Sequence, residues 1–177
     1  MRVTVFGGSQ PTEADYAAAM RLGKILGQAG HTVLTGGYIG TMEAVSRGAA
    51  EAGAHVIGVT CEEIERWRKV GPNAWVMEEL RFPTLRERLF ALIDQSDAAI
   101  ALPGGPGTLA EIAILWNLLA VHALPPRPLI LVGRGWAETF GAFFTNQNGY
   151  YAETDRQRLR FAADIEAAAA LLADPVR

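Results

Sequence analysis

The sequence is short of the residues that mark several common classes of protein. Its 177 residues include one cysteine, Cys61, which has no partner in the chain for a disulfide bridge. Only two of its sixteen basic residues are lysines, and the net charge is −3, so no basic face of the kind that binds nucleic acid is indicated. No apolar run approaches the roughly 20 residues that a membrane-spanning helix needs. We therefore expect neither nucleic acid nor membrane among the partners of this chain.

An export signal and a metal site are also missing from the pattern. The first apolar stretch ends at Phe6 and is followed at once by glycines, without the cleavage region of a signal peptide. Together with the free cysteine, this predicts a cytoplasmic location. The three histidines are far apart and have no ligand spacing to Cys61, so we expect no metal and no cofactor.

Half of the residues are hydrophobic and a fifth are charged, which is typical of a globular domain. Short apolar runs alternate with helix-like segments along the whole chain, without a linker or an internal repeat. Such alternation predicts an α/β fold in which a parallel sheet is covered by helices on both faces. The expected strands are 3–6, 31–35, 55–60, 74–80, 98–102, 129–132 and 159–161. The expected helices are 12–29, with Thr12 as N-cap, 40–52, 62–69, 85–95, 108–123, 136–144 and 164–172, with Asp164 as N-cap.

Eight of the 19 glycines fall in three turns, 7–9, 36–40 and 104–107, each between an expected strand and an expected helix. Ligands of open α/β sheets bind outside the carboxyl ends of the strands. Glycine there allows the backbone to approach a ligand, and the start of a helix attracts an anion. The alternative is that these glycines only make tight turns, but three such turns favour a phosphate-bearing ligand. The residues expected to contact it are Gly8, Ser9, Gly37, Gly40, Thr41, Glu43, Gly104, Gly105, Gly107 and Thr108.

The usual nucleotide fingerprints do not account for these turns. The first turn lacks the G-x-G-x-x-G pattern, and no glycine turn is followed by the lysine of a P-loop. Residues 105–110 do read G-x-G-x-x-A, but they lie late in the chain and the next strand ends near Arg134 rather than at an acid. We interpret this segment as a phosphate turn and not as a dinucleotide site.

The third turn belongs to a longer motif, P-G-G-x-G-T-x-x-E, at residues 103–111. At average composition its six fixed positions would occur by chance in on the order of one in 10⁵ chains of this length. The motif resembles the signature of the LONELY GUY family of cytokinin riboside 5′-monophosphate phosphoribohydrolases, proteins long labelled as possible lysine decarboxylases. A pyridoxal phosphate decarboxylase is not expected, because both lysines lie on polar stretches.

The resemblance extends over nearly the whole chain, with similar turns at residues 5–9 and 35–42 and a similar strand at 56–59. It implies a single Rossmann-like nucleotide-binding domain over 1–177, a homodimer or higher homo-oligomer, and hydrolysis of the N-glycosidic bond of a nucleoside 5′-monophosphate. It also implies that Arg88 and Glu111 are the paired catalytic residues. Two positions depart from the family pattern, because Leu89 replaces a lysine and Glu43 replaces a glycine.

Two functions stay open at this point. In the first, Glu111 orients the water and the ribose hydroxyls, while Arg88 pairs with Glu111 or contacts the phosphate. In the second, the chain is a non-catalytic carrier or sensor of a phosphorylated nucleotide-like cofactor, as in the related molybdenum-cofactor carriers. If these two residues have no catalytic role, Glu111 is an acid stabilised by the helix dipole in the first turn of a helix, and Arg88 is a surface partner of Glu87. Base contacts are expected from Tyr38 and from residues 146–151, within a flap at 145–156.

The segment 109–123 is apolar on nearly all sides of the helix that it predicts. Such a helix has to be buried on most of its surface. A subunit interface would bury it and would agree with the dimer that the resemblance implies. The alternative is a helix in the centre of the core.

Overall fold

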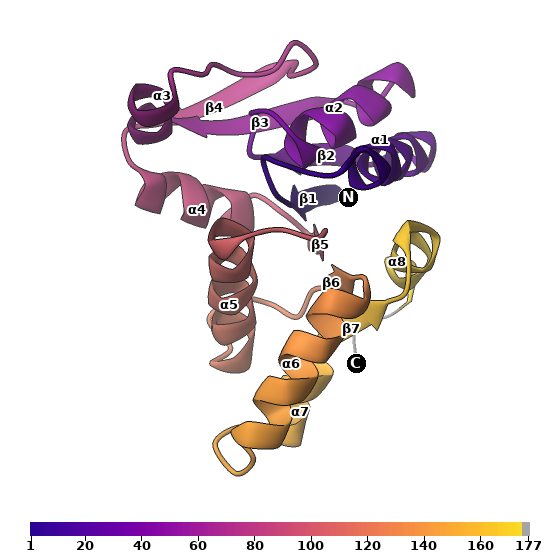
Figure 1. Cartoon of the computed structure of the whole chain (residues 1–177), viewed down its shortest axis with the longest axis vertical. Coiled ribbons are helices and arrows are strands. Elements are labelled where there is room, and N and C mark those ends of the chain that lie inside the picture. The colour runs from indigo at the N-terminus through magenta and orange to yellow at the C-terminus, as the bar shows by residue number, and fades with distance from the viewer. Residues whose placement is uncertain (175–177) are drawn as a thin grey trace.

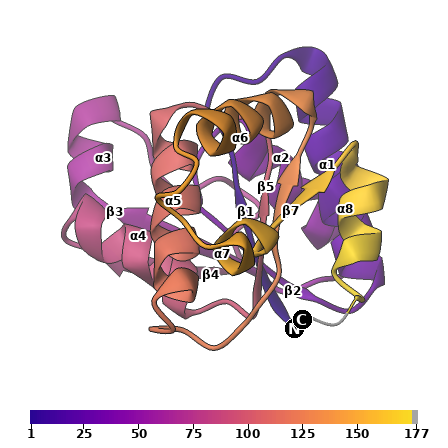
Figure 2. The same cartoon turned by 90° about the horizontal axis from the view of Figure 1, so that it is seen from below.

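The computed structural model describes residues 1–174 and forms three layers, with one parallel sheet between two layers of helices (Figures 1 and 2). The seven strands of the sheet lie in the order β4-β3-β2-β1-β5-β6-β7, and every neighbouring pair is parallel. The predicted α/β fold, Rossmann-like with helices on both faces, is confirmed.

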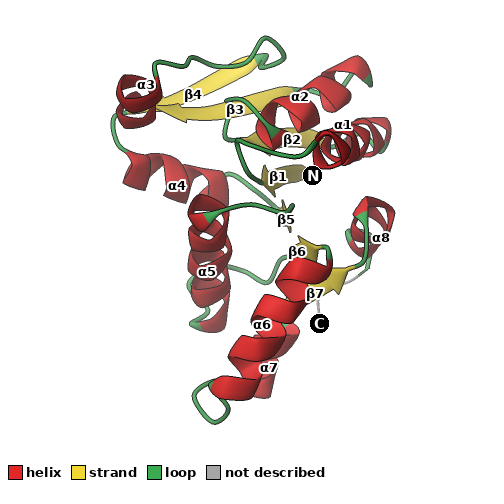
Figure 3. Ribbon diagram, in the orientation of Figure 1, coloured by secondary structure: helices red, strands yellow, loops and turns green. Residues whose placement is uncertain are grey.

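The elements follow one another along the chain as Figure 3 shows by colour. The strands are β1 Arg2–Phe6, β2 Thr32–Thr35, β3 Val56–Cys61, β4 Glu78–Phe82, β5 Ala98–Ala101, β6 Leu129–Val132 and β7 Leu159–Ala162. The helices are α1 Glu13–Gln28, α2 Thr41–Glu51, α3 Glu62–Arg68, α4 Leu85–Asp94, α5 Pro106–Ala120, α6 Arg134–Asn146, α7 Glu153–Gln157 and α8 Ile165–Leu171.

The order of the strands creates a switch point between β1 and β5. From β1 the chain builds outward through β2 and β3 to the edge strand β4. It then returns through α4 to place β5 on the other side of β1, with Val3 opposite Ala98. At such a point the connections leave the sheet toward opposite faces, and the edge where the strands end is open to a ligand.

Each face of the sheet has its own apolar core. On one face, α1, α2 and α8 pack over the strands; on the other face, α4, α5 and α6 do so (Figure 2). Alternate residues of one strand enter the two cores: Val3 and Val5 face the first, whereas Phe6 faces the second. The central strands are therefore mostly apolar and buried on both sides, as expected for a parallel sheet that is covered by helices on both faces.

The helices begin in two different ways. The helix α1 starts with a capping box in which Thr12 Oγ1 accepts from the amide of Asp15 at 3.1 Å, and α4 starts with the same arrangement of Thr84 and Glu87 at 3.2 Å. The N-cap of α8 is Asp164, so both N-caps predicted from the sequence are confirmed. By contrast, α2, α5 and α6 start at glycines that offer no side-chain cap.

Two sequence expectations differ from the structure. The fourth strand is Glu78–Phe82, not 74–80, because it is an edge strand with mostly exposed side chains and gives little hydrophobic pattern. The predicted flap at 145–156 is wrong, since α6 extends to Asn146 and α7 follows. Hydrogen bonds fix this segment: Trp116 Nε1 donates to Asp155 O at 2.7 Å, and Tyr151 Oη donates to Phe144 O at 2.8 Å.

Within residues 1–174, none of the helices combines the length and the apolar character that crossing a membrane requires.

Candidate functional site

The three glycine turns meet at the carboxyl edge of the sheet, around the switch point. The amide and the hydroxyl of Thr41 both donate to Gly8 O at 3.0 Å, which joins the turns after β1 and β2. A side chain on Gly40, whose φ is +78°, would place its Cβ 2.6 Å from that same oxygen. A Cβ on Gly8 would lie 3.4 Å from Gly104 Cα in the third turn. Glycine is needed here because the three turns approach so closely.

A cleft of about 460 Å³ opens beside these turns. Its walls come from the turn after β1, the start of α2, the short helix α3, the first half of α4 and the start of α5. The lining residues are Gly7, Gly8, Ser9, Tyr38, Met42, Glu63, Ile64, Trp67, Arg68, Leu85, Arg88, Gly105, Pro106, Gly107, Thr108 and Glu111.

The start of α5 presents free backbone donors to this cleft. The amides of Gly105, Gly107 and Thr108 have no acceptor among the residues that the structure describes. A Cβ built on Gly105 or Gly107 would meet no atom within 4 Å, so these glycines border open space. Free amides at the positive end of a helix dipole form an anion site, and a phosphate group suits it.

Arg88 reaches the cleft from α4 and is 6% exposed. Its Nε donates to Val59 O at 2.7 Å and its Nη2 to Gly36 O at 3.0 Å, so two backbone carbonyls hold the guanidinium. Gly36 makes room for it, because a side chain there would collide with the Arg88 guanidinium. Nη1 of Arg88 has no acceptor within residues 1–174, which leaves donors for a ligand. Arg88 is thus not a surface partner of Glu87, whose carboxylate caps α4.

Glu111 projects from the second turn of α5 and is 8% exposed. Burial raises the pKa of its carboxyl group to about 7, against an opposing effect of the nearby Arg88 charge. Within residues 1–174, neither Arg88 nor any other residue forms a hydrogen bond or an ion pair with the Glu111 side chain. The expected ion pair between the two is absent from the described part of the chain. The carboxyl group is therefore free to accept or release a proton near neutral pH, next to a fixed cation.

Comparison with known proteins shows which family this chain belongs to. Residues 1–124 match a family model described as the SLOG cluster4 family. The chain belongs to this family. A probable cytokinin riboside 5′-monophosphate phosphoribohydrolase of Oryza sativa subsp. japonica is 38% identical over 130 residues, 70% of this chain. That stretch is 52% of the plant protein, so the chain spans about half the length of this relative. The predicted resemblance to LONELY GUY proteins is confirmed.

Solved structures of similar fold cover almost the whole chain. A molybdenum cofactor binding protein from the phototrophic bacterium Rippkaea orientalis matches with a TM-score of 0.76 and 25% identity, over 96% of this chain and 93% of that one. The molybdenum cofactor carrier protein of Chlamydomonas reinhardtii matches with a TM-score of 0.70 and 27% identity, over 96% and 94%. This SLOG cluster4 chain thus shares sequence with phosphoribohydrolases and fold with cofactor carriers.

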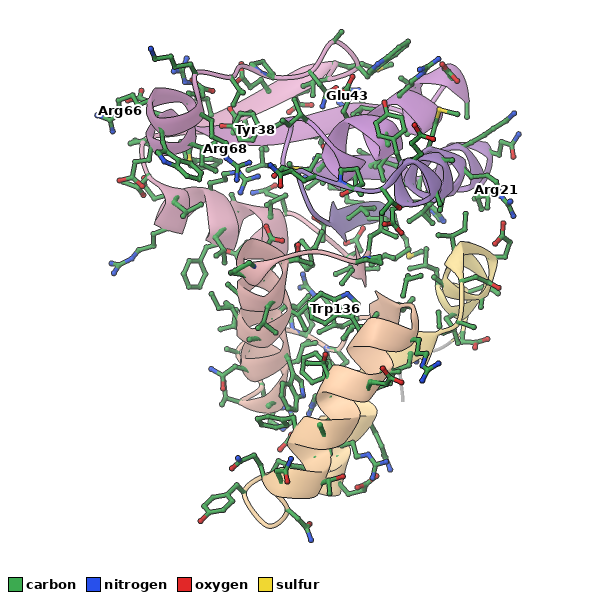
Figure 4. All side chains as sticks on the ribbon, viewed as in Figure 1. Arg21, Tyr38, Glu43, Arg66, Arg68 and Trp136 are labelled. Atoms are coloured by element: carbon green, nitrogen blue, oxygen red, sulfur yellow. The ribbon has the colours of Figure 1, made fainter. Side chains whose placement is uncertain are left out.

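The cleft of this SLOG cluster4 protein brings together most, but not all, of the predicted site residues. Those that line it are Gly8, Ser9, Arg88, Gly105, Gly107, Thr108 and Glu111. Gly37, Gly40 and Thr41 are buried behind its surface and shape the turns; a side chain on Gly37, for example, would meet Thr60 at 2.8 Å. Gly104 is exposed but does not line the cleft. Glu43 is half-buried on α2 and does not line the cleft, and Figure 4 shows it away from Arg68 and α3.

Several cleft residues were not predicted from the sequence. Met42 lines the cleft, and Gly36 lies against Met42 and Arg88; the position of the Arg88 guanidinium explains why Gly36 has no side chain. The wall formed by α3 carries no motif at all. Of the expected base contacts, Tyr38 lines the cleft but is buried, with its Oη donating to Cys61 O at 3.0 Å. Residues 146–151 do not line the cleft.

Proposed function

We propose that this chain hydrolyses the N-glycosidic bond of a nucleoside 5′-monophosphate, of the AMP or cytokinin riboside monophosphate type. The observation that carries the proposal is the position of Glu111, a buried carboxyl group with a pKa near 7, in one cleft with the free amides of Gly107 and Thr108. Glu111 follows Gly107 by four residues, which is about 6 Å along the helix axis. A phosphate at the helix start would hold its ribose beside the carboxyl group.

Hydrolysis of the N-glycosidic bond can be described with the side chains of Glu111 and Arg88 and one water. The bond between the anomeric carbon and the base nitrogen breaks, and its electron pair leaves with the base through an oxocarbenium-like state. Ionised Glu111 orients a water against the anomeric carbon and accepts its proton. The departing base takes up a proton from solvent, and Glu111 returns its proton to solvent. Arg88 holds the negative end of the substrate through its unused donors. The products are the free base and ribose 5-phosphate.

The test is to incubate the chain with AMP and with a cytokinin riboside monophosphate and to measure both products. Release of free base and ribose 5-phosphate in equal amounts, lost in Glu111→Ala, supports the proposal. A nucleotide that stays intact, or a Glu111→Ala variant as active as the parent chain, contradicts it.

A second function is favoured by the solved structures. The chain shares its fold, over 96% of its length, with a molybdenum cofactor binding protein and a molybdenum cofactor carrier protein. A phosphorylated pterin would use the same amides at the start of α5 and would leave Glu111 without a bond to break. Tight binding of such a pterin, with no base released from any nucleotide, would establish this function in place of hydrolysis.

We also propose that two copies of the chain associate through α4 and α5. The inner face of α5 is buried, but its outer side leaves Leu109 and Val121 exposed, and α4 next to it leaves Leu85 and Phe90 exposed. A second copy that covers this surface would bury the remaining apolar side of α5. Sedimentation is expected to show a dimer or a multiple of it, and a monomer at micromolar concentration would contradict the association.

A further inference from the structure

The short helix α3 carries an aromatic side chain that contributes nothing to the protein's own core. None of the residues of α3 is buried, and Trp67 is 74% exposed. The guanidinium of Arg68 lies over its ring at 4.7 Å from the centroid, and Figure 4 shows Arg68 beside Tyr38 at this end of the molecule. An indole that is exposed to water, with one guanidinium over its ring, is available to another planar group.

Trp67 is nevertheless part of the cleft that holds Glu111. The two ends of this cleft differ in chemistry. At one end are the free amides of the α5 start, and at the other end Ile64, Trp67 and Leu85 give apolar surface beside the charged Glu63 and Arg68. A ligand that fills both ends needs a phosphate at one end and an uncharged planar ring at the other.

The helix that carries Trp67 is held in place by polar contacts that do not involve the indole ring. The carboxylate of Glu63 accepts from the amide of Leu85 at 2.7 Å, which ties α3 to the start of α4. Glu65 pairs with Arg81 of β4 at 2.6 Å. These contacts position α3 without using the indole ring.

The other three tryptophans have partners within the fold and do not line the cleft. Trp136 Nε1 donates to Leu102 O at 3.0 Å, and Trp116 Nε1 donates to Asp155 O. Trp75 lies under the guanidinium of Arg47 at 5.6 Å. Trp67 is thus distinct among the four in facing the cleft.

We propose that the indole of Trp67 stacks on the base of the bound nucleotide, and that α3 is the element that selects a planar heterocycle. This inference rests on the proposed function for the identity of the ligand. The base replaces Arg68 on the exposed ring, or takes the opposite face while Arg68 stays. In both cases binding energy comes from the base, separately from the phosphate.

The experiment compares AMP with ribose 5-phosphate, which has the phosphate but no base. Their dissociation constants are measured by calorimetry for the parent chain, Trp67→Ala and Trp67→Phe. Loss of a stacking ring is expected to weaken AMP binding about 10-fold to 100-fold in Trp67→Ala, and much less in Trp67→Phe. Binding of ribose 5-phosphate is expected to be unchanged in both, which also shows that the variants are folded.

Tryptophan fluorescence gives a second readout with a matched control. AMP is expected to quench the emission of the parent chain and of Trp75→Phe, but not that of Trp67→Phe. Equal AMP affinity in the parent chain and Trp67→Ala overturns the stacking, as does a parent chain that binds AMP no better than ribose 5-phosphate. A parent chain that binds AMP tightly but releases no adenine overturns the proposed hydrolysis, while the same binding comparison still decides the role of Trp67.

Discussion

The helix starts of this molecule fall into two groups that differ in what satisfies their backbone amides. At α1 and α4, a threonine and an acid three residues later form a capping box, and the amides are occupied by the chain itself. At α2 and α5, glycines stand at the N-cap and provide no side chain. Glycine in place of a capping side chain costs a helix only a few tenths of a kcal/mol. Both of these starts border the cleft, whereas the uncapped start of α6 at Gly133 does not. At α2 and α5 the missing cap leaves donors for a ligand.

The largest expected effect concerns the acid that α5 carries into the cleft. Glu111→Gln keeps the shape of the side chain but cannot take a proton from water. We expect base release from AMP to fall between about 10²-fold and 10⁴-fold. The matched control is Glu138→Gln, which changes an exposed acid paired with Arg134 on α6 and should leave the rate unchanged. Equal rates of base release for both variants would show that Glu111 contributes no more to the reaction than a surface acid.

The same substitution should raise stability, and more so at high pH. The pKa of Glu111 is about 7 in the folded chain, against an ordinary value of 4.5, so the folded state binds the proton more tightly. The stability that this proton confers is fully present below about pH 4.5 and is lost as the pH rises through 7. The shift corresponds to about 3 kcal/mol.

Urea unfolding of Glu111→Gln and the parent chain at pH 5 and pH 8 measures this effect. The variant should be the more stable at pH 8, by about 2 to 3 kcal/mol more than at pH 5. A difference between the two proteins that does not change with pH would mean that the carboxyl group keeps an ordinary pKa.

A smaller effect is expected where the uncapped start of α5 meets a ligand. Gly107 borders open cleft, so Gly107→Ala should fold normally while its methyl group obstructs the nearby amides. We expect the affinity for ribose 5-phosphate to fall about tenfold, the loss of one hydrogen bond to a charged group. Gly141 on α6 is the control: it also has open space around it, and Gly141→Ala should add about 0.5 to 1 kcal/mol of stability without changing affinity. Equal affinities would place the phosphate elsewhere.

The smallest effect is expected at a capped start. Thr84→Ala removes the hydroxyl that accepts from the amide of Glu87 and should cost about 1 kcal/mol in the free energy of unfolding. Thr84 does not line the cleft, so the dissociation constant of ribose 5-phosphate should stay the same. A loss of affinity in this variant would show that capping and ligand binding are coupled through α4, which also carries Arg88.

The features that could be predicted from the sequence are those decided by residues close to one another along the chain. The caps Thr12 and Asp164 and the glycine turns are local signals, because a helix start or a tight turn is decided within a few residues. Glu111 could be placed because it stands at a fixed spacing from the glycines before it. These features indicated the fold and one end of the cleft.

The remaining features depend on residues brought together from distant parts of the chain. Arg88 meets the Gly36 carbonyl across 52 residues because α4 crosses back under the turn after β2. The role of Gly36 cannot be read from the turn alone. Trp67 lies in a charged, motif-free segment, and only the position of α3 beside the starts of α4 and α5 makes its exposure informative. Glu43 shows the converse, since adjacency to Met42 does not place it in the cleft: consecutive residues of a helix face different directions.

The pairing of β1 with β5 has a consequence for how the protein is made. Val3, near the beginning of the chain, is held opposite Ala98, so the centre of the sheet closes only after the ribosome has released nearly 100 residues. Such a distant pairing forms slowly, because a long loop must be closed before the contact is gained. Gly8 and Gly105 line the two sides of the cleft and come together only at that step. A nascent or partly folded chain therefore has no phosphate site, and retention on immobilised nucleotide would separate completed molecules from those still folding.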